Sequence, residues 1–292
     1  MGIDIHALKF LVAAKANGVD FSRTLTIGRQ AIDIDKAKVN TILNGCDPIR
    51  NLDKTYESEN RYSETLLKDF FAANTVHSID ASDYEGASIV ADLNTDISSE
   101  EQFTAVLDFG CLEHVFNVAQ AFDNVVRFCD IGGHILHILP TNNFCGHGFY
   151  QFSPEFFFSL YSEDRGFTDL AVYVAELNDQ NHWYHVRSTR ELRRRLELID
   201  SDATYVLSRV QKGPNAVCPL TKPPQPSDYE LVLWQTEGYA QGDLKKSAKD
   251  AVTKTLSHVG TLEPVRELWR YHVKNRQKRL SGRRRELDRI DV

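Results

Sequence analysis

A long apolar run is missing from this 292-residue chain: stretches such as residues 156–158 fall far short of the roughly 18 residues that a membrane-spanning helix requires. The five cysteines are widely spaced, and no two form a CxxC pair. Neither a disulfide framework nor a zinc site is therefore indicated, and we predict no bound metal. The first 20 residues mix charged and apolar positions at helical spacing, unlike a signal peptide. We expect a globular, cytoplasmic protein that does not associate with membranes.

The charge of the chain is distributed unevenly. Residues 264–292 contain ten Lys or Arg against four Asp or Glu, a net +6, so the total of −7 leaves −13 on the remainder. Clustered cations can bind nucleic acid. Because the body is acidic, a solvated helix or a subunit contact is the favoured interpretation, which makes the C-terminal helices a candidate surface for a homo-oligomer.

Strand-like and helix-like segments alternate along most of the chain. Helical periodicity covers residues 5–17, 35–43, 62–73, 119–128 and a segment that begins at Ser153 with Pro154 in its first turn. Strand-like runs cover residues 24–27, 76–79, 88–91, 104–107, 133–139, 170–175 and 205–210. This order predicts an α/β fold: a doubly wound, mostly parallel, seven-stranded Rossmann-like sheet with an antiparallel edge strand.

A proline-rich segment, residues 218–226, separates this pattern from the basic tail. Proline lacks the backbone N–H that a helix interior or a central strand needs, so the segment is a linker or lies extended on the surface. We therefore predict that residues 1–217 form the α/β domain. Residues 218–292 are predicted to form the linker and a basic helical extension.

Residues 76–154 place an acid after one strand, a second acid after the next, and a Gly-Gly strand after those. Their centre reads Ala105-Val106-Leu107-Asp108-Phe109-Gly110-Cys111-Leu112-Glu113-His114-Val115, followed by Ile131-Gly132-Gly133-His134-Ile135-Leu136-His137-Ile138-Leu139-Pro140. This order resembles class I S-adenosylmethionine-dependent methyltransferases over about residues 24–212, and best over residues 80–167. Residues 80–87 and 142–154 look like a poorly characterised methyltransferase-like group.

The resemblance implies that S-adenosylmethionine is bound at the carboxyl ends of the first four strands. Asp80 would accept hydrogen bonds from the ribose, Asp92 with Leu93 would recognise adenine, and Asp108 would lie beside the methionine part. The full set of implied cofactor-binding residues is Gly28, Arg29, Asp80, Ala81, Asp92, Leu93, Asp108, Phe109 and Gly110.

Two departures from the family pattern occur near the first strand. The family has an acid and a GxGxG turn there, whereas this chain has Ile27-Gly28-Arg29-Gln30. Gly28 and Asp80 are 52 positions apart, where a simple strand–helix–strand unit needs about 20. An inserted helix over residues 60–74 accounts for the excess, and the spacing argues against a nicotinamide dehydrogenase.

Methyl transfer requires alignment of an acceptor and removal of its proton, for which histidine is suited. We predict that His147 lies in the glycine-flanked loop over the pocket, with Tyr150 and His114 beside it. These three are the candidate catalytic residues, and the expected acceptor is a small or sugar-like molecule methylated on O or N. His182 and His185 could bind a metal or line an acceptor site, but a solvated loop is the favoured interpretation there.

Two other functions stay open. The reduced glycine turn at Gly28 is also consistent with a methyltransferase-like module that binds a partner or nucleoside without catalysis. A nucleic-acid methyltransferase using the basic tail is disfavoured, because the Asn-Pro-Pro-aromatic and Pro-Cys motifs of base-modifying enzymes are both missing.

Overall fold

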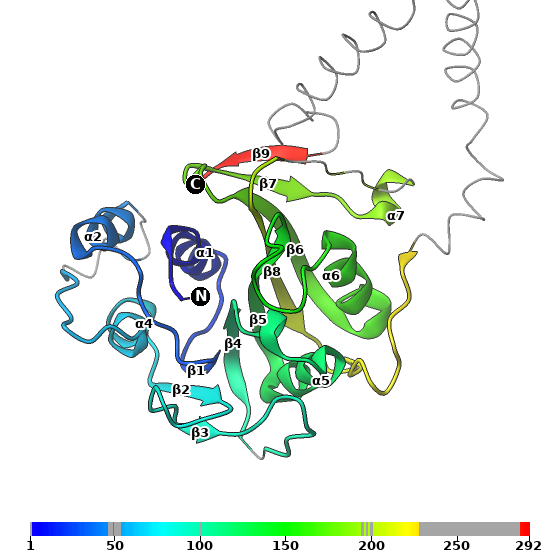
Figure 1. The fold of residues 1–292 in the computed structure, drawn as a ribbon, viewed down its shortest axis with the longest axis horizontal. Helices are drawn as coiled ribbons and strands as arrows, with labels where there is room; N and C mark the ends of the chain where they lie inside the picture. The colour runs from blue at the N-terminus through cyan, green and yellow to red at the C-terminus, as the bar shows by residue number, and fades with distance from the viewer. Residues whose placement is uncertain are drawn as a thin grey trace, which may run out of the picture.

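The computed structural model describes residues 2–45, 49, 54–99, 101–193, 196, 198, 201–227 and 287–292. Within these residues a single sheet of nine strands has the order β3-β2-β1-β4-β5-β8-β6-β7-β9 (Figure 1). The strands are β1 (Arg23–Ile27), β2 (Thr75–Asp80), β3 (Ile89–Val90), β4 (Phe103–Phe109), β5 (Cys129–Asn142), β6 (Phe167–Glu176), β7 (His182–Val186), β8 (Thr204–Lys212) and β9 (Leu287–Asp291).

The sheet has a parallel half and an antiparallel half. Strands β3, β2, β1, β4 and β5 are parallel. β8 lies between β5 and β6 and is antiparallel to both, and β7 and β9 extend the antiparallel half. The predicted doubly wound α/β architecture is confirmed. The sheet has two more strands than predicted, and its antiparallel part is larger than one edge strand.

Helices cover both faces of this sheet, as Figure 1 shows, with α1, α2 and α4 on one side and α5 and α6 on the other. Local signals set their ends: the Asp4 side chain caps α1 by accepting from the Ala7 N–H, and Pro154 occupies the first turn of α6. The helical elements are α1 (Ile5–Ala16), α2 (Lys36–Asn44), α4 (Glu64–Phe71), α5 (Val118–Phe128), α6 (Pro154–Leu160), α7 (Thr189–Leu192) and the 3-10 turns η1 (Leu112–His114) and η2 (Glu163–Arg165).

Each face of the sheet has its own apolar core. The core under α5 and α6 contains Phe122, Val125 and Val126 of α5. The opposite core contains Leu66, Leu67, Phe70 and Phe71 of α4. The insertion between β1 and β2 is therefore packed against the sheet, with α4 close to its predicted position.

The segment that contains His182 and His185 is strand β7, not the solvated loop that we favoured from the sequence. Trp183 is buried in it, and its indole N–H donates to His6 Nδ1 over 3.1 Å. His182 and His185 interrupt the apolar pattern of this short strand and hide its periodicity. His182 contacts Asp179 at 2.8 Å, whereas the ring of His185 lies against Tyr173.

The proline-rich segment lies along the outside of the α/β domain. Leu220 N–H donates to Asp123 of α5, and Ser227 donates to Glu155 of α6. Most of the predicted helical extension, with its proposed role in oligomers, lies outside the described residues. Its last residues form β9 rather than helix. No helix in the described part of the chain is long and apolar enough to cross a membrane.

Strand β9 joins residues near the C-terminus to the sheet through Leu287, which is 4% exposed and pairs with Val186. We predict that Leu287→Ala lowers the free energy of unfolding by about 2–3 kcal/mol, because it removes buried methyl groups. The control is Val292→Ala, at an exposed position, where we expect a change within about 0.5 kcal/mol. Urea unfolding of both variants measures this. Equal midpoints for Leu287→Ala and wild type would show that β9 does not stabilise the sheet.

Candidate active site

The carboxyl ends of β1 and β4 meet where the strand order reverses. Ile27 and Asp108 are paired in register, and a glycine follows each strand, Gly28 with φ 71° and Gly110 with φ 82°. Glycine adopts this left-handed conformation without the steric cost of a side chain. A Cβ on Gly28 would lie 3.6 Å from Cys111 Sγ, so the two turns are adjacent. Ligands of open α/β sheets bind at such reversals, in the crevice outside the strand ends, so the space beside these two turns, called the crevice below, is the candidate site.

Acidic residues lie at the carboxyl ends of β2 and β3, on one side of the crevice. Asp80 ends β2, and within the described residues its carboxylate accepts one hydrogen bond, from Ser82 N–H at 3.3 Å. Ala81 beside it is exposed. Asp92 follows β3 and is also exposed; hydrogen bonds from the Asn94 backbone and side chain lower its pKa. Leu93 is 5% exposed and belongs to the core under α5.

Side chains support the turn after β1, where a glycine-rich turn would rely on backbone alone. Arg29 Nε donates to Glu64 at 2.7 Å, its Nη1 donates to the carbonyl of Glu85 at 2.7 Å, and its guanidinium lies 4.0 Å from the Tyr62 ring centroid. Gln30 is buried and donates to the Ile27 carbonyl at 2.7 Å. Arg29 therefore connects this turn to the loop that follows Asp80.

Asp108 is fully buried, and both of its oxygens have partners. Oδ1 accepts from the backbone N–H groups of Cys111 and Leu112 at 3.2 and 3.3 Å. Oδ2 lies 2.8 Å from His137 Nδ1, and His137 Nε2 lies 2.7 Å from the Tyr161 hydroxyl. When the Asp108 carboxylate accepts a hydrogen bond from His137 Nδ1–H, Nε2 is left to accept one from the Tyr161 hydroxyl. The side chain of Asp108 thus holds the turn after β4 rather than facing the crevice.

The turn held by Asp108 continues into η1, which carries the most unusual titratable group of the site. Glu113 has a fully buried carboxylate, and burial together with the nearby Asp108 raises the pKa of Glu113 to about 8. Its Oε1 lies 3.3 Å from His147 Nε2 and 3.7 Å from His114 Nε2. Burial and the neighbouring His147 lower the pKa of His114. The two imidazole rings meet edge to face with centroids 4.8 Å apart.

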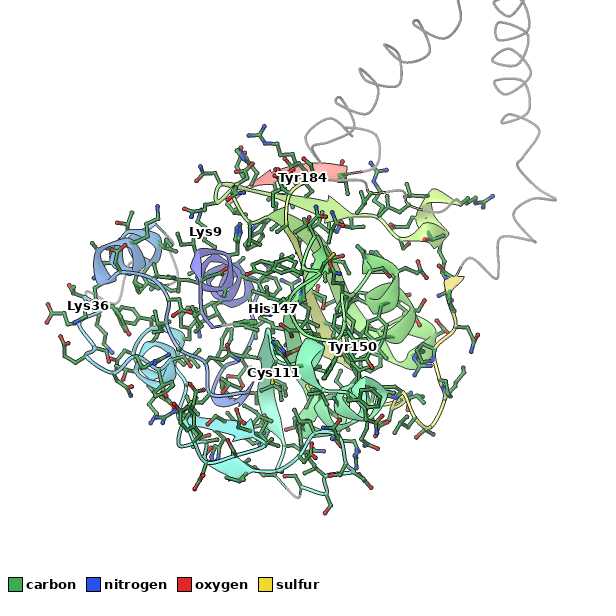
Figure 2. All side chains as sticks on the ribbon, viewed as in Figure 1. Lys9, Lys36, Cys111, His147, Tyr150 and Tyr184 are labelled. Atoms are coloured by element: carbon green, nitrogen blue, oxygen red, sulfur yellow. The ribbon has the colours of Figure 1, made fainter. Side chains whose placement is uncertain are left out.

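The loop after β5 is attached to η1 through the backbone of Glu113. The Glu113 carbonyl accepts from Phe149 N–H at 2.7 Å and from Tyr150 N–H at 3.3 Å. A Cβ on Gly148 would lie 2.8 Å from that same oxygen, so the loop needs a glycine to approach this closely. The Tyr150 hydroxyl donates to the Phe116 carbonyl at 2.7 Å. Figure 2 shows Cys111, His147 and Tyr150 in the same central region of the molecule.

The structure brings His114 and His147 together, as the sequence analysis expects, but gives Tyr150 a structural hydrogen bond. Phe109 is buried in the core under α1 and α4, so its side chain does not line the crevice. Sequence analysis missed three residues: Glu113, His137 and Tyr161. The Glu-His pair directly after a strand was a usable signal for Glu113. Nothing local links His137 or Tyr161 to Asp108, because their sequence separations are long.

A recess lies between α6, β6 and α7. It has a volume of about 480 Å³, and its lining includes Asp164, Thr168 and Arg190. None of the residues predicted to bind the cofactor lines it.

Comparison with known proteins returned no matching family model and no matching curated protein. Solved structures that match include the N-methyltransferase NodS from Bradyrhizobium japonicum WM9, with 15% identity over 71% of this chain and 95% of that chain and a TM-score of 0.38. Another is the 1,6-didemethyltoxoflavin-N1-methyltransferase from Burkholderia thailandensis, with 11% identity, 72% and 80% coverage and a TM-score of 0.38. A third is the [4+2]-cyclase SpnF, with 12% identity, 70% and 80% coverage and a TM-score of 0.38. At these values the likeness is one of general arrangement, and it selects no activity.

The buried chain of contacts from Asp108 to Tyr161 predicts a stability effect. Tyr161→Phe removes the hydroxyl that pairs with His137 Nε2 and leaves that nitrogen unpaired, which should lower the free energy of unfolding by about 1–3 kcal/mol. Tyr84→Phe is the matched control, since Tyr84 is 90% exposed, and it should change stability by less than about 0.5 kcal/mol. Urea unfolding followed by circular dichroism compares the two. If both variants match wild type, the hydroxyl does not support the network.

Proposed function

We propose that this chain binds S-adenosylmethionine in the crevice between β1 and β4 and transfers its methyl group to a small or sugar-like acceptor, on O or N. The observation that carries the proposal is a pair of adjacent positive-φ glycine turns, at Gly28 and Gly110, beside a strand that ends at Asp80. Within the described residues the Asp80 carboxylate accepts a single hydrogen bond. Backbone can approach a ligand closely at both turns. The carboxylate can accept hydrogen bonds from a ribose diol.

The remaining predicted residues extend this binding mode along the sheet edge. Asp92 would accept from the adenine amino group, with Leu93 beneath the ring, and Ala81 would flank the ribose. Arg29 connects the two loops that would enclose the ribose. For Asp108 and Phe109 we propose indirect roles, because the side chain of each is buried. Asp108 positions the turn of Gly110, and any contact from Phe109 would come from its backbone.

The acceptor would lie over η1 and the loop after β5. Methyl transfer from a sulfonium is an in-line displacement, in which the sulfur keeps the electron pair of the broken carbon–sulfur bond. The acceptor atom must lose its proton if it is a hydroxyl or an ammonium group. His147 and His114 are the groups proposed to orient that atom and take up the proton. At the rim of the site, the exposed rings of Phe116 and Phe149 offer an apolar surface, with centroids 6.0 Å apart.

One observation favours a second candidate function, a binding module without catalysis. Gln30 is folded into the turn after β1, with Nε2 3.7 Å from the position of a Cβ on Gly28. Arg29 is held by Glu64 and Glu85 beside it. If these contacts persist in solution, the turn has less freedom to open around a cofactor. A role for the basic tail in binding nucleic acid concerns residues that lie largely outside the described ones.

Calorimetry with S-adenosylhomocysteine tests the proposal. Asp80→Ala should weaken binding by about 1.5–3 kcal/mol, because it removes a charge-assisted pair of hydrogen bonds to the ribose. This corresponds to a roughly 10- to 150-fold increase in Kd.

Two variants serve as controls for Asp80→Ala. Asp83→Ala removes an exposed carboxylate from the same loop and should leave the affinity unchanged. His147→Ala, on the acceptor side, should change it by no more than about twofold. Absence of wild-type binding at millimolar ligand would contradict catalysis and favour the binding module. An equal effect of Asp80→Ala and Asp83→Ala would show that the ribose does not lie at Asp80.

A further inference from the structure

The Glu113 carboxylate is buried without enough partners. Its Oε1 has His147 Nε2 at 3.3 Å, a long contact, and its Oε2 has no hydrogen-bond partner within the described residues. A carboxylate removed from water normally acquires a cation or several hydrogen bonds, since its desolvation is costly. The site therefore holds one carboxylate oxygen near two histidine nitrogens and a second, buried oxygen that no described group satisfies.

The cluster has the dimensions of a metal site. One ligand atom each from Glu113, His114 and His147 lies within 4.8 Å of the others. Two of the separations, both from Glu113 Oε1, are 3.3 and 3.7 Å. A tetrahedral ion with bonds of about 2.0–2.1 Å has ligand atoms about 3.3–3.4 Å apart. Rotation of the two half-exposed imidazoles would have to bring the remaining separation, which is at most 4.8 Å, into this range.

We propose that Glu113, His114 and His147 bind one divalent first-row transition-metal ion, with Zn²⁺ as the representative. Two imidazoles and one carboxylate form a mixed nitrogen and oxygen donor set that suits such ions, whereas Mg²⁺ prefers oxygen ligands alone. Three protein ligands leave at least one coordination position for water or another molecule. The proposal replaces the sequence-based expectation of no metal. It concerns metal binding itself and is independent of S-adenosylmethionine binding. A histidine nitrogen that binds the ion cannot also take up a proton, so the proton-accepting role proposed above for His114 and His147 belongs to the metal-free protein.

The fold fixes the backbone that carries these ligands before any ion binds. Asp108 accepts from the turn that leads into η1, and this places Glu113 and His114. The loop that carries His147 is attached to the Glu113 carbonyl by two backbone hydrogen bonds, with Gly148 in close contact. Ligands from two loops are thus joined through one backbone oxygen.

The test is a titration of untagged, metal-free, full-length protein with Zn²⁺ by calorimetry in the presence of a competing chelator. We expect one ion per chain for wild type, no competition by millimolar Mg²⁺, and a Co²⁺ absorption spectrum of a coordinated ion. His147→Asn and His114→Asn should each weaken Zn²⁺ binding by at least about 100-fold, since changes that only reorient a ligand already cost about 10–100-fold. Glu113→Gln should weaken binding too, because the ligand loses its charge.

The matched control is His77→Asn, because His77 also lies 3.7 Å from a single carboxylate, that of Glu101, and has 31% side-chain exposure against 34% for His147. It should leave Zn²⁺ affinity within about twofold of wild type. Cys145→Ser, which removes an exposed thiol from the loop of His147, should also leave it unchanged. Circular dichroism melting confirms that each variant is folded. Because His114 and His147 are half-exposed, their variants decide the question if Glu113→Gln fails to fold.

Several outcomes would overturn the metal site. One is a wild-type protein that binds Zn²⁺ no better than His147→Asn. Another is a loss of binding in Cys145→Ser or His77→Asn as large as that in the cluster variants. A third is a Glu113→Gln variant that weakens S-adenosylhomocysteine binding while Zn²⁺ affinity stays as in wild type, since Oε2 would then serve the amino group of the cofactor.

Discussion

The buried carboxylate of Asp108 is the constraint on which the geometry of the site depends. One of its oxygens accepts from the turn after β4, and the other is held by His137, which in turn contacts Tyr161 of the segment after α6. A buried carboxylate is stable only when such partners are complete. The turn therefore has one position relative to β5 and α6. The 3-10 turn η1, which follows directly and carries Glu113, takes its place from that position.

The same constraint reaches the loop after β5 indirectly. The Glu113 carbonyl accepts hydrogen bonds from the N–H groups of Phe149 and Tyr150. The position of the loop therefore depends on that of η1, and His147 reaches the Glu113 carboxylate. The cofactor side of the crevice is arranged differently. There the turn after β1 depends on Arg29 and Gln30 rather than on a glycine-rich backbone. The two ends of the site thus differ in how far they are preorganised. The end proposed to hold the acceptor is fixed by a buried carboxylate, and the end proposed to hold the cofactor is fixed by the side-chain contacts of Arg29 and Gln30.

Sequence analysis recovered the parallel half of the fold because its signals are local. The apolar face of α5, the buried run in β5 and the proline at the start of α6 each identify an element without knowledge of its neighbours. The short strands β7 and β9 were missed because their side chains are mixed in polarity and their pairing joins distant segments. Charged side chains on an edge strand such as β9 are common, since they discourage further strand addition, but they remove the alternation that identifies a strand.

The site was predictable in part for the same reason. The acids and glycines at strand ends are local features, and His114 and His147 were placed together through the order of strands. The role of Asp108 was not predictable, because His137 and Tyr161 reach it through tertiary packing. The resemblance led us to expect a ligand-facing carboxylate at this position. Burial, which sequence does not display for a single acid at a strand end, gives it a positioning role instead.

The central claim is that a nucleoside cofactor binds at the carboxyl ends of β1 and β4. A crystal structure of the protein with S-adenosylhomocysteine tests it most directly. The account predicts a ligand whose ribose contacts Asp80, whose methionine part lies against Gly28 and Gly110, and whose sulfur faces the Glu113 and His147 side of the crevice. A crevice closed by Gln30, or a ligand found instead in the recess between α6 and α7, would contradict it.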